Sequence, residues 1–500
     1  MTARVVMVQG TSSSAGKSLL VAGLCRVLRQ EGYRVAPFKA QNMALNAAVT
    51  AEGLEIGRAT AVQAEAAGVE ASVDMNPILL KPEADSRCQV VLLGRPAGSL
   101  PAHLYYQRKG ELWATVASAL DRLRERYDVV VIEGAGSPAE VNLRDSDLVN
   151  MRVARHARSP VLLVGDIDRG GVFASLVGTL ALLEPEERAL IGGLVINKFR
   201  GDPSLLGSGL RFLEERTGVP VLGVVPFLRD LLLSQEDSVG LDSFSAGSGL
   251  VDIAVIRLPR IANFDDFDLL GAEPTVGLRY VKEPEQLGRP DLVILPGSKG
   301  TVADLEFLRR SGLDRAIIAQ AKTGTPVLGI CGGYQMMGER ILDPDGVESD
   351  RPVTTGLGLL PATTTFHARK RTIRVEATVL DSSGPFTRAA GERIRAYEIH
   401  MGRTEHSGAA AFRLVEDGNS LLEGCVARQG LAMGSYLHGL FENRCVRQAL
   451  VDWLVERRGL PPLRRQQEVV GREASYDRLA DCLRRHLDLP RVWQMMGLQR

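Results

Sequence analysis

The residues best suited to covalent chemistry lie in a short stretch around a single cysteine. Residues 326–338 read Pro-Val-Leu-Gly-Ile-Cys-Gly-Gly-Tyr-Gln-Met-Met-Gly. The apolar run predicts a strand, the paired glycines a sharp turn and the Met-rich continuation a helix, so Cys331 stands at the apex. A thiol held in this way can act as a nucleophile, whereas most free cysteines are inert core residues. The flanking glycines favour the nucleophile, because a packing residue does not need them.

A second candidate site, for phosphate, lies near the N-terminus. Residues 10–18 read Gly-Thr-Ser-Ser-Ser-Ala-Gly-Lys-Ser, between a strand-like run and a helical run. In such a loop backbone N–H groups hold phosphates, the lysine reaches the terminal phosphates, and the last hydroxyl binds Mg²⁺. An ordinary turn is the alternative. We expect ATP contacts from Gly10, Thr11, Gly16, Lys17 and Ser18. The usual first glycine position is taken by Thr11, one residue after Gly10; this shifted form is similar to dethiobiotin synthetase and its relatives.

Charged residues at the ends of two other predicted strands complete this site. Glu133 ends the apolar run 129–132, the position from which a carboxylate can hold Mg²⁺ with Ser18; helix capping or solvation is the alternative. Lys39 ends the predicted strand 33–39, where it can bind a substrate carboxylate or a phosphate, unless it is a solvated surface lysine. The resemblance to P-loop enzymes implies that Asn197 lies beside the nucleotide base.

The order of strands and helices around these residues predicts an α/β fold with two domains. Strands alternate with helical stretches over residues 1–233, which indicates a doubly wound parallel sheet. Residues 234–250 are rich in Ser, Gly and Asp and are the expected linker. A second α/β domain is expected over 251–447. Residues 448–500 predict amphipathic, Arg-rich helices, which we expect to cover the second domain.

Composition excludes several classes of protein. The 500 residues carry 60 Lys and Arg against 60 Asp and Glu, so no basic excess favours nucleic acid as a partner. Six cysteines without C-x-x-C spacing indicate neither a zinc site nor a disulfide framework, and favour a reducing compartment. The chain enters a strand without a signal peptide, and its longest apolar run, 171–183, is too short to span a bilayer. We therefore expect a soluble, cytoplasmic protein without a membrane partner.

The cysteine turn resembles the G-x-C-x-G-x-Q elbow of class I glutamine amidotransferases, here residues 329–335. The resemblance implies that Cys331 attacks the side-chain amide of glutamine and that His438, which ends the predicted strand 430–438, is its base. A hydrogen-bonded core histidine is the alternative. Many relatives carry a glutamate two residues after this histidine, where the present chain has Leu440, so the expectation is a Cys–His dyad. Glutamine-binding residues implied by the resemblance, including oxyanion donors, are Gly297, Gly332 and Gln335.

Taken together, the two halves resemble the cobyric acid synthase family over nearly the full length. The segments that carry this resemblance are residues 10–18, 39–43, 76–82 and 397–403. It implies ATP- and glutamine-dependent amidation of the b, d, e and g carboxylates of adenosylcobyrinic acid a,c-diamide, with ATP and Mg²⁺ as cofactors. The alternatives are an a,c-diamide synthase, a cell-wall amidating ligase, or a nucleotide-switched scaffold with an inert amidotransferase-like domain.

Overall fold

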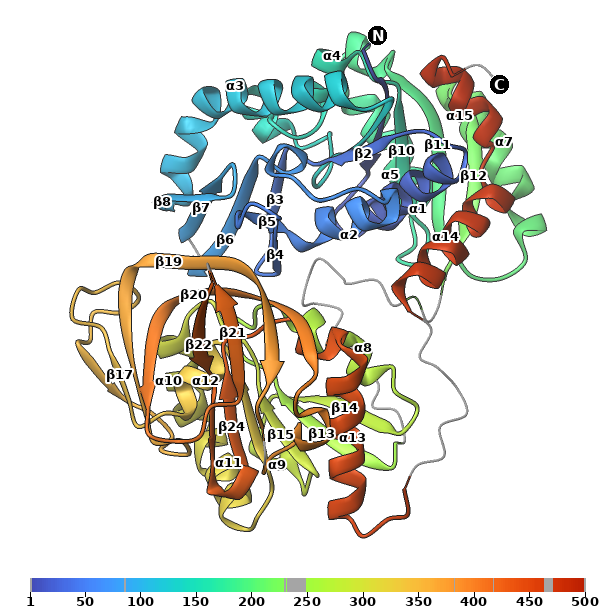
Figure 1. Cartoon of the computed structure of the whole chain (residues 1–500). Helices are drawn as coiled ribbons and strands as arrows, with labels where there is room; N and C mark the ends of the chain where they lie inside the picture. The colour runs from blue at the N-terminus through green and yellow to red at the C-terminus, as the bar shows by residue number, and fades with distance from the viewer. Residues whose placement is uncertain are drawn as a thin grey trace. The chain divides into compact units, whose positions relative to one another are not determined.

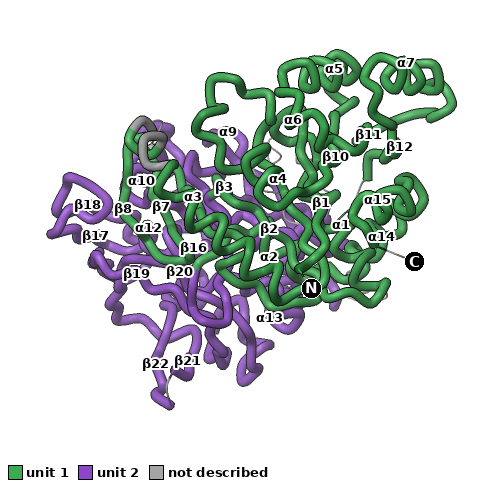
Figure 2. Tube along the Cα trace, turned by 90° about the horizontal axis from the view of Figure 1, so that it is seen from above, with its two compact units in different colours: residues 1–44, 55–233, 470–500 green, residues 45–54, 234–469 purple. Residues whose placement is uncertain are grey.

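The computed structural model describes residues 2–84, 87–228, 231, 249–381, 383–416, 418–462 and 471–498. They form two compact units, coloured green and purple in Figure 2. The first unit comprises residues 1–44, 55–233 and 470–500, and the second comprises 45–54 and 234–469. Apart from residues 249 and 250, the expected linker lies outside the described residues.

The first unit is built on a six-stranded parallel sheet in the order β12-β11-β10-β1-β9-β2. Its strands are β1 (Arg4–Gly10), β2 (Val35–Phe38), β9 (Val129–Glu133), β10 (Val161–Asp166), β11 (Ile191–Phe199) and β12 (Val221–Pro226). The central strands are apolar and fully buried, as parallel strands must be when both faces are covered. The prediction of a doubly wound parallel sheet is confirmed.

Helices and a smaller sheet complete the first unit. The helices of this half of the chain are α1 (Lys17–Gln30), α2 (Arg58–Ala67), α3 (Ala102–Arg126), α4 (Met151–Ala157), α5 (Val172–Leu182), α6 (Pro185–Arg188) and α7 (Gly207–Thr217). The smaller sheet has the order β3-β6-β7-β8. Its strands are β3 (Gln41–Met43), β6 (Ile78–Ala84), β7 (Arg87–Leu92) and β8 (Arg95–Pro101), and β5 (Glu55–Gly57) leads into α2.

The last two helices of the chain also belong to the first unit. α14 (Arg472–His486) and α15 (Leu489–Met496), red in Figure 1, lie beside α1 and β12. Leu483 and Trp493 are buried in the same apolar cluster as Leu24 of α1. The expectation that the C-terminal helices cover the second domain is therefore wrong for residues 471–498. An amphipathic helix predicts that one face is buried, but its pattern does not name the surface that buries it.

The second unit contains a six-stranded sheet in the order β14-β13-β15-β16-β24-β23. All neighbours are parallel except β23 and β24. The strands are β13 (Val251–Ile256), β14 (Val276–Val281), β15 (Leu292–Leu295), β16 (Val327–Ile330), β23 (Cys425–Ala427) and β24 (Ala432–Ser435). The helices are α8 (Asp268–Gly271), α9 (Pro284–Leu287), α10 (Thr301–Ser311), α11 (Leu313–Lys322), α12 (Gly332–Met337) and α13 (Arg444–Arg457).

A second sheet of this unit is dominated by the long antiparallel pair of β19 and β20. Its strands are β17 (Arg340–Leu342), β18 (Val353–Thr355), β19 (Ala362–Val379), β20 (Arg393–His406), β21 (Phe412–Glu416) and β22 (Asn419–Glu423). Residues 45–54, which contain β4 (Ala47–Val49), pack against β19 and β20 (Figure 1), and Arg374 Nε donates to Val49 O at 2.6 Å. The expected boundary, which assigned all of residues 1–233 to one domain, therefore differs from the structure here.

Two further observations bear on the expected class of protein. Within the described residues, every helix is too short or too polar to cross a lipid bilayer. All six cysteines are free thiols, and five of them are buried.

Candidate active sites

The cysteine turn has the strand, sharp turn and helix that its sequence predicted. Cys331 joins β16 to α12 with φ 50° and ψ −108°, a strained conformation for a residue with a side chain. Its N–H donates to Ser435 O at 2.8 Å, and its side chain is almost buried, with 7% of the residue exposed. A Cβ atom at Gly333 would lie 1.9 Å from Leu295 O, so only glycine fits there. The turn therefore holds the thiol in one fixed place.

His438 is brought to the thiol by the neighbouring strand. β24 pairs with β16 in parallel, so the residues that follow both strands meet at the same edge of the sheet. The imidazole is hydrogen-bonded to Cys331, and its Nδ1 lies 2.7 Å from Asp266 Oδ2. Burial alone lowers the pKa of His438, but Asp266 and Cys331 outweigh burial and raise it to about 10. Asp266 and Cys331 therefore favour the charged form of His438.

Asp266 contacts His438, and the sequence did not point to this residue. Its second carboxylate oxygen accepts the Gly439 N–H at 2.8 Å, so one carboxylate fixes both the imidazole and the backbone beside it. The Cys–His dyad expected from the sequence is thus a chain of three groups, with Asp266 in the orienting position. The available signal was the adjacent acids Asp265 and Asp266 after the buried strand 251–256, but nothing in the spacing joins them to His438.

The expected oxyanion donors lie at the same edge. A Cβ atom at Gly332 would lie 2.9 Å from Ser298 N, and one at Gly297 would lie 3.2 Å from His438 Cε1. The backbones of the 296–298 loop and of the cysteine turn thus adjoin each other beside the thiol. Preorganised backbone N–H groups in such a place stabilise a developing oxyanion.

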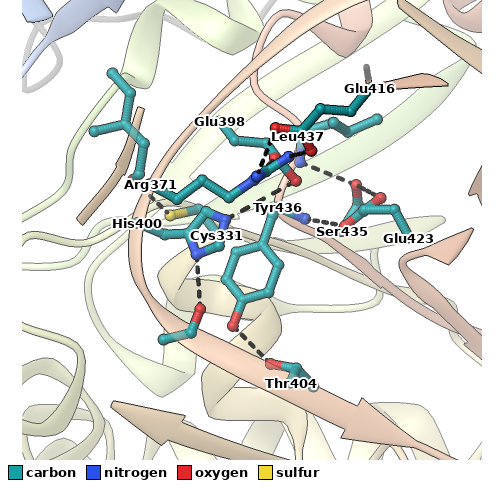
Figure 3. Close-up of polar contacts among 12 residues, drawn as sticks. Cys331, Arg371, Glu398, His400, Thr404, Glu416, Glu423, Ser435, Tyr436 and Leu437 are labelled. Carbon is teal, nitrogen blue, oxygen red and sulfur yellow. Dashed lines mark hydrogen bonds and ion pairs between the residues drawn. The ribbon is translucent and has the colours of Figure 1, made fainter. Parts of the chain in front are cut away.

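Gln335 lies one turn into α12, where its side-chain amide is occupied within the protein. Its Oε1 accepts from Thr301 Oγ1 at 2.9 Å and its Nε2 donates to Tyr436 Oη at 3.3 Å. Tyr436 in turn shares a 2.6 Å hydrogen bond with Thr404 and stacks on His400 with ring centroids 3.8 Å apart (Figure 3). The structure places Gln335 near the nucleophile and shows it as part of this network; glutamine binding by Gln335 stays a prediction.

Behind the thiol, the buried Glu398 of β20 joins a network of charges that includes two partly buried residues, Arg371 of β19 and Glu416 of β21 (Figure 3). Cys331 Sγ lies 3.6 Å from Ile399 O, and the preceding residue, Glu398, pairs with Arg371, which also binds Glu416 at 2.8 Å. Burial raises the pKa of Glu398, but His400 and Arg371 together hold it below its ordinary value. The network ties β20 to β19 and β21, and the backbone of β20 next to Glu398 contacts the thiol.

In the first unit, the phosphate loop leads from β1 into α1. Gly16 has φ 94°, and a Cβ atom there would lie 2.1 Å from Asn197 Nδ2, so the position requires glycine. Lys17 Nζ donates to Ser12 O at 3.0 Å and to Gly136 O at 3.2 Å. The lysine thus lies folded over the loop, where phosphate oxygens are held in sites of this kind.

The other residues expected at the nucleotide join this loop to differing degrees. Asn197 Nδ2 donates to Ala15 O at 2.9 Å, which places Asn197 against the loop backbone. A Cβ atom at Gly10 would lie 3.0 Å from Lys17 Nζ. Thr11 follows β1 directly, and its N–H donates to Val164 O of the neighbouring strand. The structure therefore gathers the expected loop residues at one edge of the sheet.

Glu133 is the residue on which the polar side chains beside the phosphate loop converge. Its carboxylate, which is almost fully buried, accepts from Ser18 Oγ at 2.7 Å and Gln63 Nε2 at 2.5 Å, and pairs with Lys39 Nζ at 3.0 Å. Burial raises the pKa of Glu133, but Lys39, Gln63 and Ser18 reverse this effect and hold it below its ordinary value. Lys39 is therefore a buried partner of Glu133; its expected contact with substrate stays a prediction.

Ser18 and Glu133 also fit the magnesium ion expected here. Hydroxyl and carboxylate oxygens are ligands that Mg²⁺ accepts, and these two atoms converge beside the phosphate loop. The described part of the chain has no cluster of three or more His, Cys, Asp or Glu side chains suited to a metal. Such an ion would thus take its other ligands from phosphate and water, as Mg²⁺ usually does.

Comparison with known proteins finds a match for each half of the chain. Residues 6–239 match the CobQ/CobB/MinD/ParA nucleotide binding domain, and residues 252–446 match the CobB/CobQ-like glutamine amidotransferase domain. The chain is 54% identical to a cobyric acid synthase of Sorangium cellulosum, with 100% of both chains covered. It is 51% identical to a cobyric acid synthase of Dehalococcoides mccartyi, with 99% of both covered. One from Moorella thermoacetica is 51% identical, covering 100% of this chain and 98% of the relative. The chain therefore belongs to the cobyric acid synthase family.

Proposed function

We propose that this chain amidates the b, d, e and g carboxylates of adenosylcobyrinic acid a,c-diamide, using glutamine as the nitrogen source and ATP as the source of energy. The observation that carries the proposal is the full-length likeness to cobyric acid synthases, in a chain that holds both a thiol site and a phosphate loop. Neither site alone supports the proposal, because one liberates nitrogen and the other activates its acceptor.

Ammonia is released in the second unit. Cys331 Sγ attacks the side-chain carbonyl carbon of glutamine, and His438 holds the proton of the thiol. The tetrahedral oxyanion is stabilised by the backbone N–H groups of Gly332 and Ser298. His438 then donates its proton to the departing ammonia, which leaves a thioester on Cys331. Water hydrolyses the thioester to glutamate and restores the thiol.

The carboxylate is activated in the first unit. A carboxylate cannot expel oxide, so its oxygen first takes the terminal phosphoryl group of ATP to give an acyl phosphate. Lys17 and the loop N–H groups stabilise the negative charge of the phosphoryl group during this transfer. Ser18 and Glu133 would hold Mg²⁺, which supplies further charge neutralisation when bound. Ammonia then attacks the acyl carbon and inorganic phosphate leaves, giving the amide.

Replacing Cys331 tests whether the thiol is needed only for obtaining ammonia from glutamine. We expect Cys331→Ala to lose glutamine-supported amidation by roughly 10³-fold or more, because the covalent step needs the sulfur. Amidation supported by ammonium chloride is expected to stay within about twofold of the unmodified protein, because ammonia needs no thiol to reach the acyl phosphate. Both rates are measured with ATP and adenosylcobyrinic acid a,c-diamide, and mass spectrometry counts the amides.

The matched control is Cys445→Ala, which removes a partly exposed free thiol of α13. It is expected to leave both nitrogen sources unaffected. Glutamine use that survives in Cys331→Ala would remove the thiol from the mechanism, and equal loss with both nitrogen sources would make Cys331 structural. Amidation of cobyrinic acid in preference to its a,c-diamide would instead make the chain an a,c-diamide synthase.

A further inference from the structure

A segment from the first fifth of the chain is built into the glutaminase unit. Residues 45–54 belong to the second unit, although β3 before them and β5 after them belong to the first. Asn46, one of the polar side chains of this segment, is 1% exposed, so it is committed to contacts within the protein. The hydrogen-bond partners of residues 45–54 indicate the role of this segment.

The partner of the segment is a short turn, Asn263–Phe267. Ala47 N donates to Asn263 Oδ1 at 3.0 Å, and Phe264 N donates to Asn46 Oδ1 at 3.3 Å. Asn263 is buried and has φ 52°, a left-handed conformation that asparagine tolerates better than most residues. Two reciprocal hydrogen bonds thus fix the start of the turn.

The same turn carries Asp266, which orients His438. Asp266 N donates to Asn263 O at 3.1 Å, so the carboxylate is placed by the backbone that the segment holds. Asn263 Nδ2 also donates to Tyr397 Oη at 3.3 Å, and the Tyr397 ring stacks on His438 with centroids 5.3 Å apart. Backbone hydrogen bonds join Tyr397 and His438 in both directions. The segment therefore reaches the imidazole by two routes, through Asp266 and through Tyr397.

We propose that Asn46 and Asn263 are positioning residues for glutamine hydrolysis, and that the segment 45–54 completes the glutaminase site by fixing Asp266 and Tyr397 against His438. This inference rests on the proposed role of Cys331 and His438 in glutamine hydrolysis. It adds that the residues matched to the amidotransferase domain, 252–446, do not hold the whole site. The part of the site that lies outside them, residues 45–54, falls within the residues matched to the nucleotide binding domain, 6–239.

The test uses Asn263→Gly in the full-length protein. Glycine adopts φ 52° without strain, so this change removes both side-chain hydrogen bonds and leaves the backbone conformation available. We expect kcat for glutamine hydrolysis to glutamate to fall about tenfold with KM within about twofold, because the imidazole is less well aligned while glutamine contacts remain. Asn46→Ala, which alters the other side of the contact, is expected to have the same effect at smaller size.

The pH profile separates positioning from loss of folded protein. The titratable groups against His438 are Asp266, Cys331 and Tyr397. Asp266 favours the imidazolium form of His438. A weaker contact between the two residues therefore lowers the pKa of His438 and moves the alkaline limb of the kcat profile to lower pH in both variants. Ammonium-supported amidation, measured on the same samples, is expected to be unchanged. The control is Glu52→Gln, an exposed residue of the same segment, which is expected to match the unmodified protein throughout.

An unchanged pH profile, or an equal loss of ammonium-supported amidation, would overturn the inference and make the two asparagines merely structural. Wild-type glutamine hydrolysis in both variants would overturn it as well. Failure of the proposed function gives a different result, namely glutamine hydrolysis that survives in Cys331→Ala. The two failures are thus distinguished by which variant keeps the activity.

Discussion

The thiol site of the second unit and the phosphate site of the first unit arrange their polar groups in opposite ways. In the second unit three groups stand in series, so that Asp266 acts on His438 and His438 acts on Cys331. In the first unit three donors act in parallel on the single carboxylate of Glu133. Removing any link of a series disturbs everything after it, whereas removing one of several parallel donors leaves the others in place. The difference suits the chemistry, because covalent catalysis needs alignment and phosphoryl transfer needs balanced charge.

The largest effect is expected from removing the Glu133 carboxylate, on which the three donors of the first unit converge. We expect Glu133→Gln to reduce amidation by about 10³-fold with either nitrogen source, because the charge that balances Lys39 and binds Mg²⁺ is lost. Glutamine hydrolysis without ATP is expected to persist. Both are measured as product formed per enzyme, with Glu140→Gln, an exposed acid of the same unit, as the control. Amidation that continues in Glu133→Gln would show that this carboxylate is not needed for the activation of the acceptor.

Breaking the series at its first link is expected to have a smaller effect, confined to glutamine. Asp266→Asn keeps the shape of the side chain but removes its charge, so glutamine-supported kcat falls by about 10²-fold while ammonium-supported amidation is unchanged. Without this carboxylate the imidazolium of His438 loses its proton at lower pH, so the alkaline limb of the glutaminase profile moves down from the range set by a pKa of about 10.

A suitable control for this series is Asp291→Asn. Its carboxylate accepts the Asp252 N–H at 2.7 Å just before β15, at the end of the strand away from the thiol. It is expected to leave the pH profile in place. A profile that Asp266→Asn does not move would contradict the orienting role of Asp266.

The smallest effect is expected from removing one of the parallel donors. Gln63→Leu deletes the hydrogen bond to Glu133 Oε2 but leaves Ser18 and Lys39, so amidation with either nitrogen source is expected to fall only about tenfold. The measurement is kcat at saturating ATP. The control is Gln30→Leu, which removes the hydrogen bond from Gln30 of α1 to Asp477 of α14. If Gln63→Leu were as damaging as Glu133→Gln, the donors would not act in parallel.

The sequence predicted the parts of each site that are local in the chain. The cysteine turn and the phosphate loop each lie within a short stretch, where glycines and strand-to-helix periodicity carry the geometry. It also predicted the parallel sheet of the first unit, because buried apolar strands alternate with helices. In both cases the deciding interactions join residues close together in sequence.

Contacts between distant residues could not be predicted in the same way. Asp266 and His438 are 172 residues apart, and the resemblance pointed instead to a position near the histidine, which here is leucine. The partner of residues 45–54 was missed because three-residue strands such as β4 carry too short a pattern to indicate which surface covers them. The docking of α14 and α15 was missed because amphipathicity predicts burial without naming its surface.

The place of α14 and α15 has a consequence for how the protein is made. Protein synthesis runs from the N-terminus, so β1 and α1 leave the ribosome before the glutaminase, yet Leu483 and Trp493, which share their apolar cluster, leave it after the glutaminase. The nucleotide-binding unit cannot finish its core until translation has passed through the whole glutaminase. A nascent chain therefore carries a completed nitrogen-releasing unit before it has a completed acceptor-activating one, and translation that stopped before α14 would leave it in that condition.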